Sequence, residues 1–359
     1  MGETHCFQAG DLHAMTRRLL MAADTPRPVA DDVAEILVNS NLAGHDSHGV
    51  LRIPFYLQSI SEGGLDPAAE PRVAHETANT LLVDGNNGFG HYAARKAMGL
   101  AIEKAAQADV CCVSFVRIGH IGRLGEYAEA ATRAGCIGLI TVGGGAKHNG
   151  ATVPFGGRVG ALGTNPMAVG VPTGDDTPFI IDFATSRVAE GKLQVARSKN
   201  ADLPEGYILD KHGNPSVRTM DFYEGGYLLP FGEHKGYALA LLICLLGGLS
   251  GNFNVEKGAM NGAFMQVVNV DAFTPLEAYQ KGVRALLDGM KATPPAPGFD
   301  EVVVPGDFER RFRVARLADG IELPDTIYAQ IQEWAGRLNV CLSEAAAEAA
   351  DIERYQDSQ

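Results

Sequence analysis

The sequence predicts an α/β protein in which a helical N-terminal region precedes a sheet that is at least partly parallel. Apolar residues recur at helical spacing through the first ~80 residues. Short apolar segments then alternate with helical ones from residue 80 to residue 142, which is typical of parallel strands joined by helices. The composition, with 46% hydrophobic and 20% charged residues, is that of a globular protein.

Three helices are expected in the N-terminal region. The first covers residues 11–22, and Pro26 and Pro28 then interrupt the pattern before it resumes at residues 31–42. Acidic residues in the first turn favour the start of this second helix. The third helix is expected at residues 50–61 and ends at Gly63 and Gly64.

The remaining elements form the α/β region. Strands are expected at residues 80–83, 110–116, 137–142, 179–181, 267–270 and 302–304, and helices at 91–106, 123–133, 236–249 and 275–290. Another helix carries Glu190, with Thr185 or Ser186 as its cap. The pattern changes near residue 78. We therefore expect a helical region at residues 1–78, C-terminal helices at 323–359 that pack back on it, and an α/β region at 79–322.

The charge and the apolar segments exclude several functions. Thirty Lys and Arg residues against 43 Asp and Glu residues give a formal net charge of −13. No Lys/Arg group is longer than a pair, so we expect no nucleic-acid partner. The most apolar run, residues 237–249, is shorter than the ~20 residues that span a bilayer, and no secretory signal is visible. Together with six scattered cysteines, this predicts a cytoplasmic protein with reduced thiols and no membrane partner.

The first candidate site is the GHDSHG segment at residues 44–49. His48 beside Ser47 can be held in one tautomer and act as an acid or base near neutral pH. Arg52 begins the next helix and offers two parallel N–H donors to a carboxylate. The alternative is a helix-capping loop in which Asp46 or Ser47 bonds backbone amides. A metal site is not expected, because the short His pair has no third ligand at a regular spacing.

A second candidate is the GFGHYA segment at residues 88–93. It matches the G-x-G-x-x-A pattern that opens a helix after a strand in Rossmann dinucleotide-binding folds. Those folds place an acidic residue after the next strand to hold the ribose, whereas this chain has Arg117 there. An arginine could instead meet a 2′-phosphate, but a short glycine motif is weak on its own.

Four further segments are denser in polar groups than ordinary loops. Residues 117–123 (RIGHIGR) lie where a strand ends and a helix begins, so backbone amides, His120 and two arginines can meet an anion. Residues 163–166 (GTNP) and 182–186 (DFATS) put hydroxyl, amide and carboxylate groups at turns and strand ends. Residues 230–236 (PFGEHKG) precede the most apolar helix, as a charged triplet aimed at a buried helix N-terminus. Each segment can instead be a cap or a turn.

In this order, the motifs resemble the type 2 malate/L-lactate dehydrogenase family, whose members are nicotinamide-dependent oxidoreductases unrelated to the Rossmann lactate dehydrogenases. The resemblance covers about residues 7 to 340. Within the family, the HIGR and EHKGYALA segments are most similar to the hydroxycarboxylate dehydrogenase branch. The matching segments are GHDSHGVLRIP (44–54), DGNNGFGHYAARKAM (84–98), GHIGRLGEYA (119–128), FGGRVGALGTNP (155–166), DFATS with GK (182–192), LLPFGEHKGYALA (228–240) and VPGDFERR (304–311).

The resemblance implies a mixed sheet, antiparallel toward its edges, with a non-Rossmann nicotinamide site, an intimate homodimer and NAD or NADP as cofactor. The GFGHYA segment is then a structural turn. His48 matches the proton donor, Ser47 its neighbour in the relay and Arg52 the carboxylate anchor. Other substrate contacts fall on Thr164, Glu190 and Gly191, and cofactor contacts on His120, Ile121, Gly122, Arg123, Leu124, Asp182, Phe183, Ala184, Glu233, His234, Pro305, Gly306, Asp307, Glu309 and Arg311.

One position departs from part of the family. Lys192 stands where the imino-acid reductases have an Asp that completes a charge relay, which favours keto acids over cyclic imines. Asp46 or a backbone group is then left to orient His48. The expected reaction is reversible hydride transfer between a nicotinamide and C2 of a 2-oxo acid, with His48 exchanging the proton at a pKa near the working pH. An imine reductase on the same scaffold and a catalytically silent binding protein are the alternatives.

The net charge predicts where positive potential must lie. At −13 the chain repels both an anionic acid and a dinucleotide, so local cations have to recruit them. Arg117 and Arg123 near the cofactor loop make NADPH worth testing. The residues expected to concentrate positive potential are His48, Arg52, His120, Arg123, His234 and Lys235.

Overall fold

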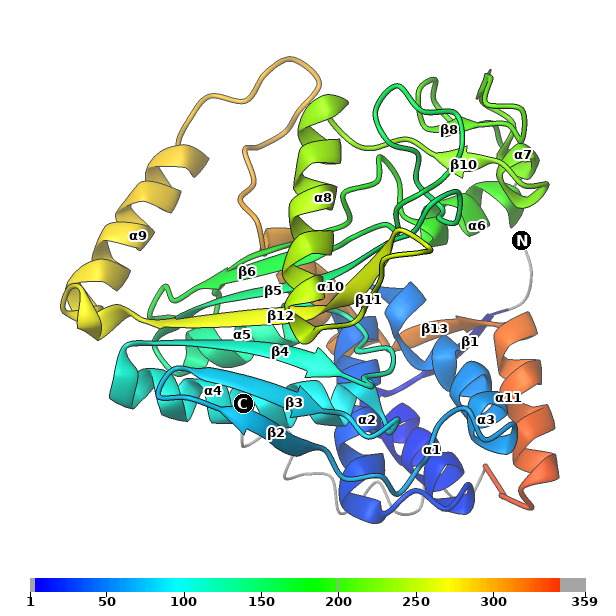
Figure 1. Ribbon diagram of the computed structural model, residues 1–359, viewed down its shortest axis with the longest axis horizontal. Helices are drawn as coiled ribbons and strands as arrows, with labels where there is room; N and C mark the ends of the chain where they lie inside the picture. The colour runs from blue at the N-terminus through cyan, green and yellow to red at the C-terminus, as the bar shows by residue number, and fades with distance from the viewer. Residues whose placement is uncertain (1–3, 199, 343–359) are drawn as a thin grey trace.

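A mixed β-sheet forms the centre of the molecule (Figure 1). The computed structural model describes residues 4–198 and 200–342. The main sheet follows the order β2 (Arg72–Glu76), β3 (Thr80–Asp84), β4 (Val110–Val116), β12 (Ala259–Asn269), β5 (Cys136–Gly145), β6 (Met167–Val171) and β7 (Phe179–Phe183). β3 and β4 are parallel, and the other neighbours on this path are antiparallel. The expected mixed α/β class is confirmed.

Helices cover both faces of this sheet (Figure 1). α4 (Gly90–Ala108) and α5 (Gly125–Arg133) lie on one face, and α8 (His234–Gly247) crosses the other. Strand β5 shows how closely they pack. A Cβ at Gly138 would lie 2.7 Å from the Cβ of Ala131 in α5, and one at Gly143 would lie 2.7 Å from the backbone nitrogen of Cys244 in α8. Glycine at these positions lets both helices approach the strand.

The N-terminal helices pack against the last elements of the described chain. α1 (Ala9–Ala22), α2 (Arg27–Leu42) and α3 (Ile53–Ser61) share a buried apolar core with α11 (Asp325–Arg337). Strand β1 (Thr4–Phe7) pairs with β13 (Ile321–Pro324). α2 begins at Arg27 rather than at residue 31, because Pro28 fits the first helical turn, where an N–H is not needed. Residues 343–359, part of the expected C-terminal helices, lie outside the described residues.

A small lobe follows β7 at residues 187–229. It contains α6 (Glu190–Ser198), α7 (Thr219–Tyr223) and the short strands β8 (Ile208–Leu209), β9 (Pro215–Ser216) and β10 (Tyr227–Leu228) around its own apolar core. The helix expected at Glu190 is present. The expected cap is wrong, because the hydroxyls of Thr185 and Ser186 donate to the carbonyls of Thr164 and Val188.

The last elements include one correction. They are β11 (Phe253–Asn254), α9 (Leu276–Lys291), α10 (Asp307–Asp319) and the single turns η1 (Asp46–His48), η2 (Val50–Arg52), η3 (Gly248–Ser250) and η4 (Val270–Ala272). The strand expected at residues 302–304 is wrong. Val304 donates its N–H to the Asp307 carboxylate at 3.0 Å and so leads into α10. Among the helices in the described ranges, none is long and apolar enough to cross a membrane.

Candidate active site

The loop that carries His48 is fixed from two sides. At the end of α2, the side chain of Asn41 accepts the N–H of Val50 at 2.9 Å and donates to the Asp46 carboxylate at 2.7 Å. From α10, Arg316 donates to both oxygens of Asp46 at 2.7 and 2.9 Å. Asp46 is therefore a structural anchor, and the expectation that it orients His48 is wrong.

Ser47 is the direct neighbour of the His48 ring. Its hydroxyl lies 3.0 Å from Nδ1 of His48, so Nε2 is the nitrogen that remains for a ligand. Arg52 donates its Nε–H to the Ser47 carbonyl at 2.7 Å. The start of α6 lies beside this group, because a Cβ at Gly191 would be 3.1 Å from the Cβ of Ser47. The exposed Glu190 precedes it.

His120 joins this group from the loop after β4. Its ring stacks on that of His48, with centroids 5.7 Å apart and an interplanar angle of 17°. Tyr56, one helical turn after Arg52 in α3, lies with its hydroxyl 2.7 Å from Nδ1 of His120. The fold thus places His48 and Arg52 in one group, in line with their short sequence spacing, and adds His120 to it. Tyr56 was missed, although its spacing from Arg52 would place both on one helix face.

Both stacked imidazoles are neutral near pH 7. Burial, followed by the neighbouring His120 and Arg52, lowers the pKa of His48 to about 3. Burial and Arg52 lower the pKa of His120 to about 4. The expectation that these histidines supply positive potential is therefore wrong, and the pKa of His48 without a ligand lies well below the near-neutral value that its expected proton exchange needs. Arg52 remains the cation of this group.

The second group surrounds Asp182 at the end of β7. Its carboxylate accepts the Gly125 N–H at the start of α5 at 2.7 Å. The Arg123 guanidinium is buried, 3.7 Å from Asp182 and paired with Glu129. Arg123 is therefore not the accessible source of positive potential that the sequence suggested. Beside these residues, Ile121 and Leu124 are buried, Gly122 has a φ of +74°, Phe183 is exposed and Ala184 is half-buried.

The segment at residues 304–311 reaches the same region through Glu309. Its carboxylate lies 3.4 Å from Nε2 of His45. Asp307 instead pairs with Lys291 at 2.8 Å and bonds Val304, so its carboxylate holds the start of α10. Arg311 pairs with Glu301 at 2.7 Å. In the turn after Pro305, Gly306 has a φ of +99°, and a Cβ there would lie 2.9 Å from the carbonyl oxygen of Pro178.

A third group joins the GTNP, DFATS and PFGEHKG segments. Thr185 donates its N–H and hydroxyl to the Thr164 carbonyl at 2.8 and 2.9 Å and accepts the N–H of Phe231 at 3.0 Å. Glu233, with a φ of +57°, and His234 are exposed at the start of α8. The expected buried N-terminus of α8 is therefore wrong.

The glycine motif at residues 88–93 has a structural role, because it packs against a neighbouring loop. A Cβ at Gly90 would lie 2.4 Å from the carbonyl oxygen of Gly119, so this turn is pressed against the loop that carries His120. Arg117 donates its Nε–H to Asp84 at 2.9 Å. Because this ion pair engages Arg117, the argument that it meets a 2′-phosphate loses its support.

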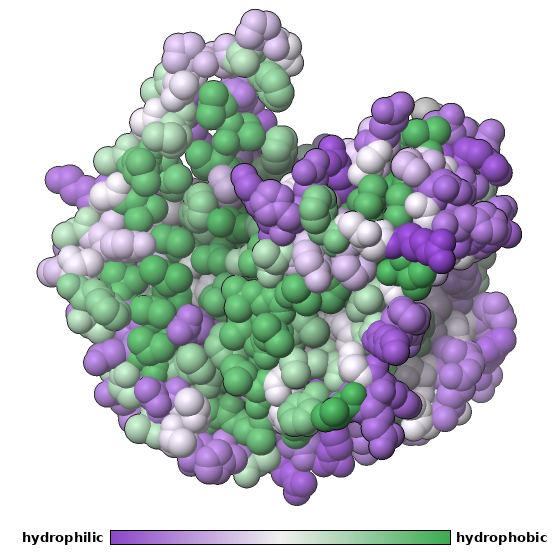
Figure 2. Space-filling view, turned by 45° about the horizontal axis from the view of Figure 1, so that its top comes forward, coloured by the Kyte–Doolittle hydropathy of each residue, from purple (hydrophilic) through white to green (hydrophobic). Residues whose placement is uncertain are grey.

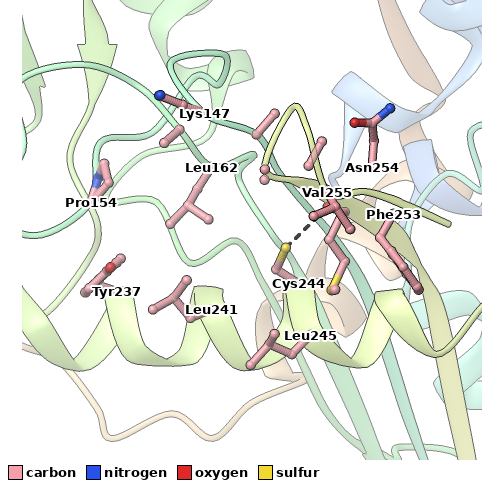
Figure 3. Close-up of a pocket in the computed structure, with 16 residues that line it drawn as sticks. Lys147, Pro154, Leu162, Tyr237, Leu241, Cys244, Leu245, Phe253, Asn254 and Val255 are labelled. Carbon is pink, nitrogen blue, oxygen red and sulfur yellow. Dashed lines mark hydrogen bonds between the residues drawn. The ribbon is translucent and has the colours of Figure 1, made fainter. Parts of the chain in front are cut away.

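A cavity of about 530 Å³ lies apart from these groups, between α8 and the β11–β12 hairpin (Figure 3). Tyr237, Leu241 and Leu245 of α8 line one side, and Phe253 and Val255 line the other. The lining is mostly apolar and includes none of the expected site residues.

Comparisons with known proteins agree with this fold and site. The malate/L-lactate dehydrogenase model matches residues 7–332. An L-lactate dehydrogenase from Cupriavidus necator is 34% identical over 341 residues, which are 92% of this chain and 97% of that protein. The fold and these matches define an oxidoreductase. The chain belongs to the malate/L-lactate dehydrogenase family.

Solved structures show the same fold. Malate dehydrogenase from Entamoeba histolytica matches with a TM-score of 0.88 at 26% identity, over 94% of this chain and 99% of that one. A delta1-piperideine-2-carboxylate reductase from Pseudomonas syringae pvar. tomato matches with a TM-score of 0.79 at 31% identity, over 92% of this chain and 100% of that one.

Proposed function

We propose that this chain is a nicotinamide-dependent dehydrogenase that interconverts a 2-oxo acid and its 2-hydroxy acid. The observation that carries the proposal is the grouping of His48, Ser47 and Arg52 in one loop beside His120. Arg52 holds the carboxylate of the acid, and His48 moves a proton to or from the oxygen on C2. Ser47 holds the His48 ring.

Arg52 and His48 are linked through charge. The terminal nitrogens of Arg52 have no hydrogen-bond partner among the described residues. A bound carboxylate neutralises this guanidinium, which is one cause of the low pKa of His48. Binding of the acid therefore makes His48 easier to protonate. This order suits reduction, in which His48 donates its proton after the 2-oxo acid has bound.

The residues around His120 and Asp182 fit a nicotinamide cofactor. Loop 119–125 is rich in glycine and leads into the N-terminus of α5, where backbone N–H groups favour an anionic ligand. Under this loop, the buried Arg123 guanidinium is not fully satisfied by Glu129 and Asp182, because its Nε and Nη1 have no hydrogen-bond partners among the described residues. We propose that this loop, residues 182–184, Glu233, His234 and residues 305–311 hold the cofactor, which supplies the hydride when bound.

A cyclic imino acid reductase is the second candidate, because a reductase of that kind shares the fold. Lys192 speaks against it. This residue is exposed on α6 and carries an ammonium group, so it cannot supply the carboxylate of the proposed relay. Rates on pyruvate-type acids and on cyclic 2-imino acids, each with NADH and NADPH, separate the two activities and identify the cofactor.

His48→Ala tests the proposal. We expect kcat for 2-oxo acids to fall by at least ~100-fold, since general acid–base catalysis contributes about that much, while cofactor binding is retained. NAD(P)H absorbance reports turnover, and fluorescence titration reports cofactor binding. His75→Ala, on the exposed strand β2, is the matched control. Unchanged turnover in His48→Ala would exclude His48 as the proton donor.

We also propose that the chain forms a homodimer through its apolar face. We define this α8 face by Leu242, Leu245, Leu249, Phe253 and Val255, each more than half exposed. Figure 2 shows a broad apolar area in the middle of the molecule. Such areas usually mark an interaction site. Residues 236–255 carry no charged side chain, so two copies can meet here without charge repulsion despite the net charge of −13.

A further inference from the structure

A chain of hydrogen bonds runs behind the candidate site from His91 to His120. The Tyr56 hydroxyl lies 2.7 Å from Nδ1 of His120 and 3.3 Å from Nε2 of His91. Tyr56 and His91 are fully buried, whereas part of the His120 side chain stays exposed and its ring stacks on that of His48. The proposed reaction assigns no role to Tyr56 or His91, yet both are joined to a ring of the site.

His91 and His120, the two histidines joined by these hydrogen bonds, are neutral near pH 7. Burial, followed by the neighbouring His120 and His48, holds the pKa of His91 well below its ordinary value. Burial and Arg52 lower that of His120. A neutral imidazole has one N–H and one bare nitrogen, and a tyrosine hydroxyl has one proton to donate. The protons can therefore be ordered from His91 toward His120 or in the opposite direction.

Two observations favour the direction toward His120. Nδ1 of His91 is buried and has no hydrogen-bond partner among the described residues. A buried N–H without an acceptor is rarer than an unpaired acceptor, so the proton of His91 belongs on Nε2, where it points to Tyr56. In addition, 2.7 Å between Tyr56 and His120 is typical of a hydroxyl donor, whereas 3.3 Å to His91 suits a weak N–H donor.

The packing around His91 keeps this geometry in place. Gly122, in the same loop as His120, has a φ of +74°, and a Cβ there would lie 2.8 Å from Cδ2 and Nε2 of the His91 ring. His91 itself begins α4 next to Gly90, whose absent Cβ makes room for the carbonyls of Gly119 and His120. The loop is therefore built against His91, and the two histidines have a fixed separation.

We infer that His91 and Tyr56 are positioning residues that hold His120 in the tautomer with its proton on Nε2, as a neutral donor to an oxygen of the bound acid. The two stacked imidazoles then have different tasks. His48 beside Ser47 exchanges a proton. His120, which begins the proposed cofactor loop and stacks on His48, is the residue of that loop that donates to the acid and orients it. The identity of this ligand rests on the proposed function, but the tautomer is a property of the free protein.

The first test reads the tautomer directly. Side-chain ¹⁵N chemical shifts of the histidines are measured at pH 7.5 in the ligand-free protein, with His120→Gln to assign the signal. We expect a protonated Nε2 and a bare Nδ1 in the parent protein, and a mixture of tautomers in Tyr56→Phe. A parent protein with the proton on Nδ1 of His120 would overturn the inference, as would an unchanged His120 signal in Tyr56→Phe.

The second test separates positioning from packing at His91. His91→Gln keeps an N–H donor close to the place of Nε2, whereas His91→Met has a similar volume and no donor. We expect the KM for the acid to rise about 5-fold in His91→Met, the equivalent of one neutral hydrogen bond, with a smaller change in kcat. His91→Gln should recover most of this loss.

The two tests separate the inference from the proposed function. Equal KM values in His91→Met and His91→Gln would show that the hydrogen bond from His91 has no positioning role. Absence of turnover of any 2-oxo acid by the parent protein would instead contradict the proposed function. The tautomer of His120 is measured in the free protein, so its result stands in either case.

Discussion

At the scale of single residues, the candidate site sets neutral imidazoles beside the guanidinium of an arginine. Arg52 lies close enough to lower the pKa of both His48 and His120, and its Nε is held by the Ser47 carbonyl. The geometry therefore fixes both the position and the direction of the guanidinium. Arginine suits this task because its planar group can bind both oxygens of a carboxylate.

Arg52→Lys tests the need for a planar guanidinium. A lysine keeps the charge but offers no parallel N–H donors, so we expect kcat/KM for 2-oxo acids to fall by about 10- to 100-fold through a higher KM. Steady-state kinetics measure the change. Arg337→Lys on α11, in an exposed pair with Glu333, is the control. Parent-like kinetics would remove Arg52 from the substrate site.

His48 also makes the stability of the chain depend on pH. Its pKa is lowered to about 3 in the folded chain, mainly by burial, against 6.5 as its ordinary value. Between these values the unfolded chain binds more protons, so His48 lowers the free energy of unfolding as the pH falls below 6.5. At pH 5 the loss is about 2 kcal/mol. Urea unfolding of the parent protein, His48→Gln and the control His75→Gln is measured at pH 7 and pH 5. The free energy of unfolding lost between the two pH values should be about 2 kcal/mol smaller in His48→Gln than in the parent protein.

The residues of the site that the sequence predicted are those with a local signal. Ser47, His48 and Arg52 lie within one short segment, so their chemistry is visible without a structure. His91 and Arg316 act through residues far away in the sequence, and spacing cannot reveal such contacts. The charge of Arg123 suggested an accessible site for an anion, but the structure buries this residue and pairs it with Glu129. Burial of this kind is not visible in the sequence.

At the scale of elements, a half-buried cation joins three helices around the site. Arg95 of α4 contacts Asp32 at 3.0 Å and Glu35 at 2.7 Å, both in α2, and Glu126 of α5 at 3.2 Å. Glu126 is almost fully buried, and Asn39 of α2 donates to it at 3.2 Å. These contacts hold α2, which ends at the His48 loop, against the two helices on the sheet.

Arg95→Met should therefore destabilise the fold strongly. It removes the arginine that contacts the buried Glu126, and losses of about 3 to 5 kcal/mol in the free energy of unfolding are typical of such changes. Arg337→Met, which removes an exposed pair within one helix, should cost less than ~1 kcal/mol. Urea unfolding at one fixed protein concentration measures both. Equal losses in the two variants would contradict a clamping role for Arg95.

The sequence predicted best those elements whose pattern is long and regular. β4 was predicted with its observed bounds, and α4 and α9 differ by two residues or fewer at each end. β1 and β2 were missed, because both are short and expose much of their surface. The opposite error occurred at residues 302–304, where three valines indicate a strand but the neighbouring Asp307 turns the chain into α10.

At the scale of the whole molecule, the α8 face predicts a dimer. Leu245→Asp places a charge on this exposed apolar face, so two copies should separate, because an unpaired buried charge costs several kcal/mol. Sedimentation velocity measures the mass. Leu100→Asp on α4, which lies on the opposite side of the sheet, is the control. A parent protein that sediments as a monomer would contradict the proposed interface.

The pairing of β1 with β13 has a consequence for synthesis. Thr4 pairs with Pro324, so strand β1 waits for its partner until residue 324 has left the ribosome. Arg316, which anchors the His48 loop through Asp46, emerges equally late. Contacts of such long range slow folding. The nascent chain can fold its parallel β3–α4–β4 unit early, but it has no finished site for an acid until its last helices are made.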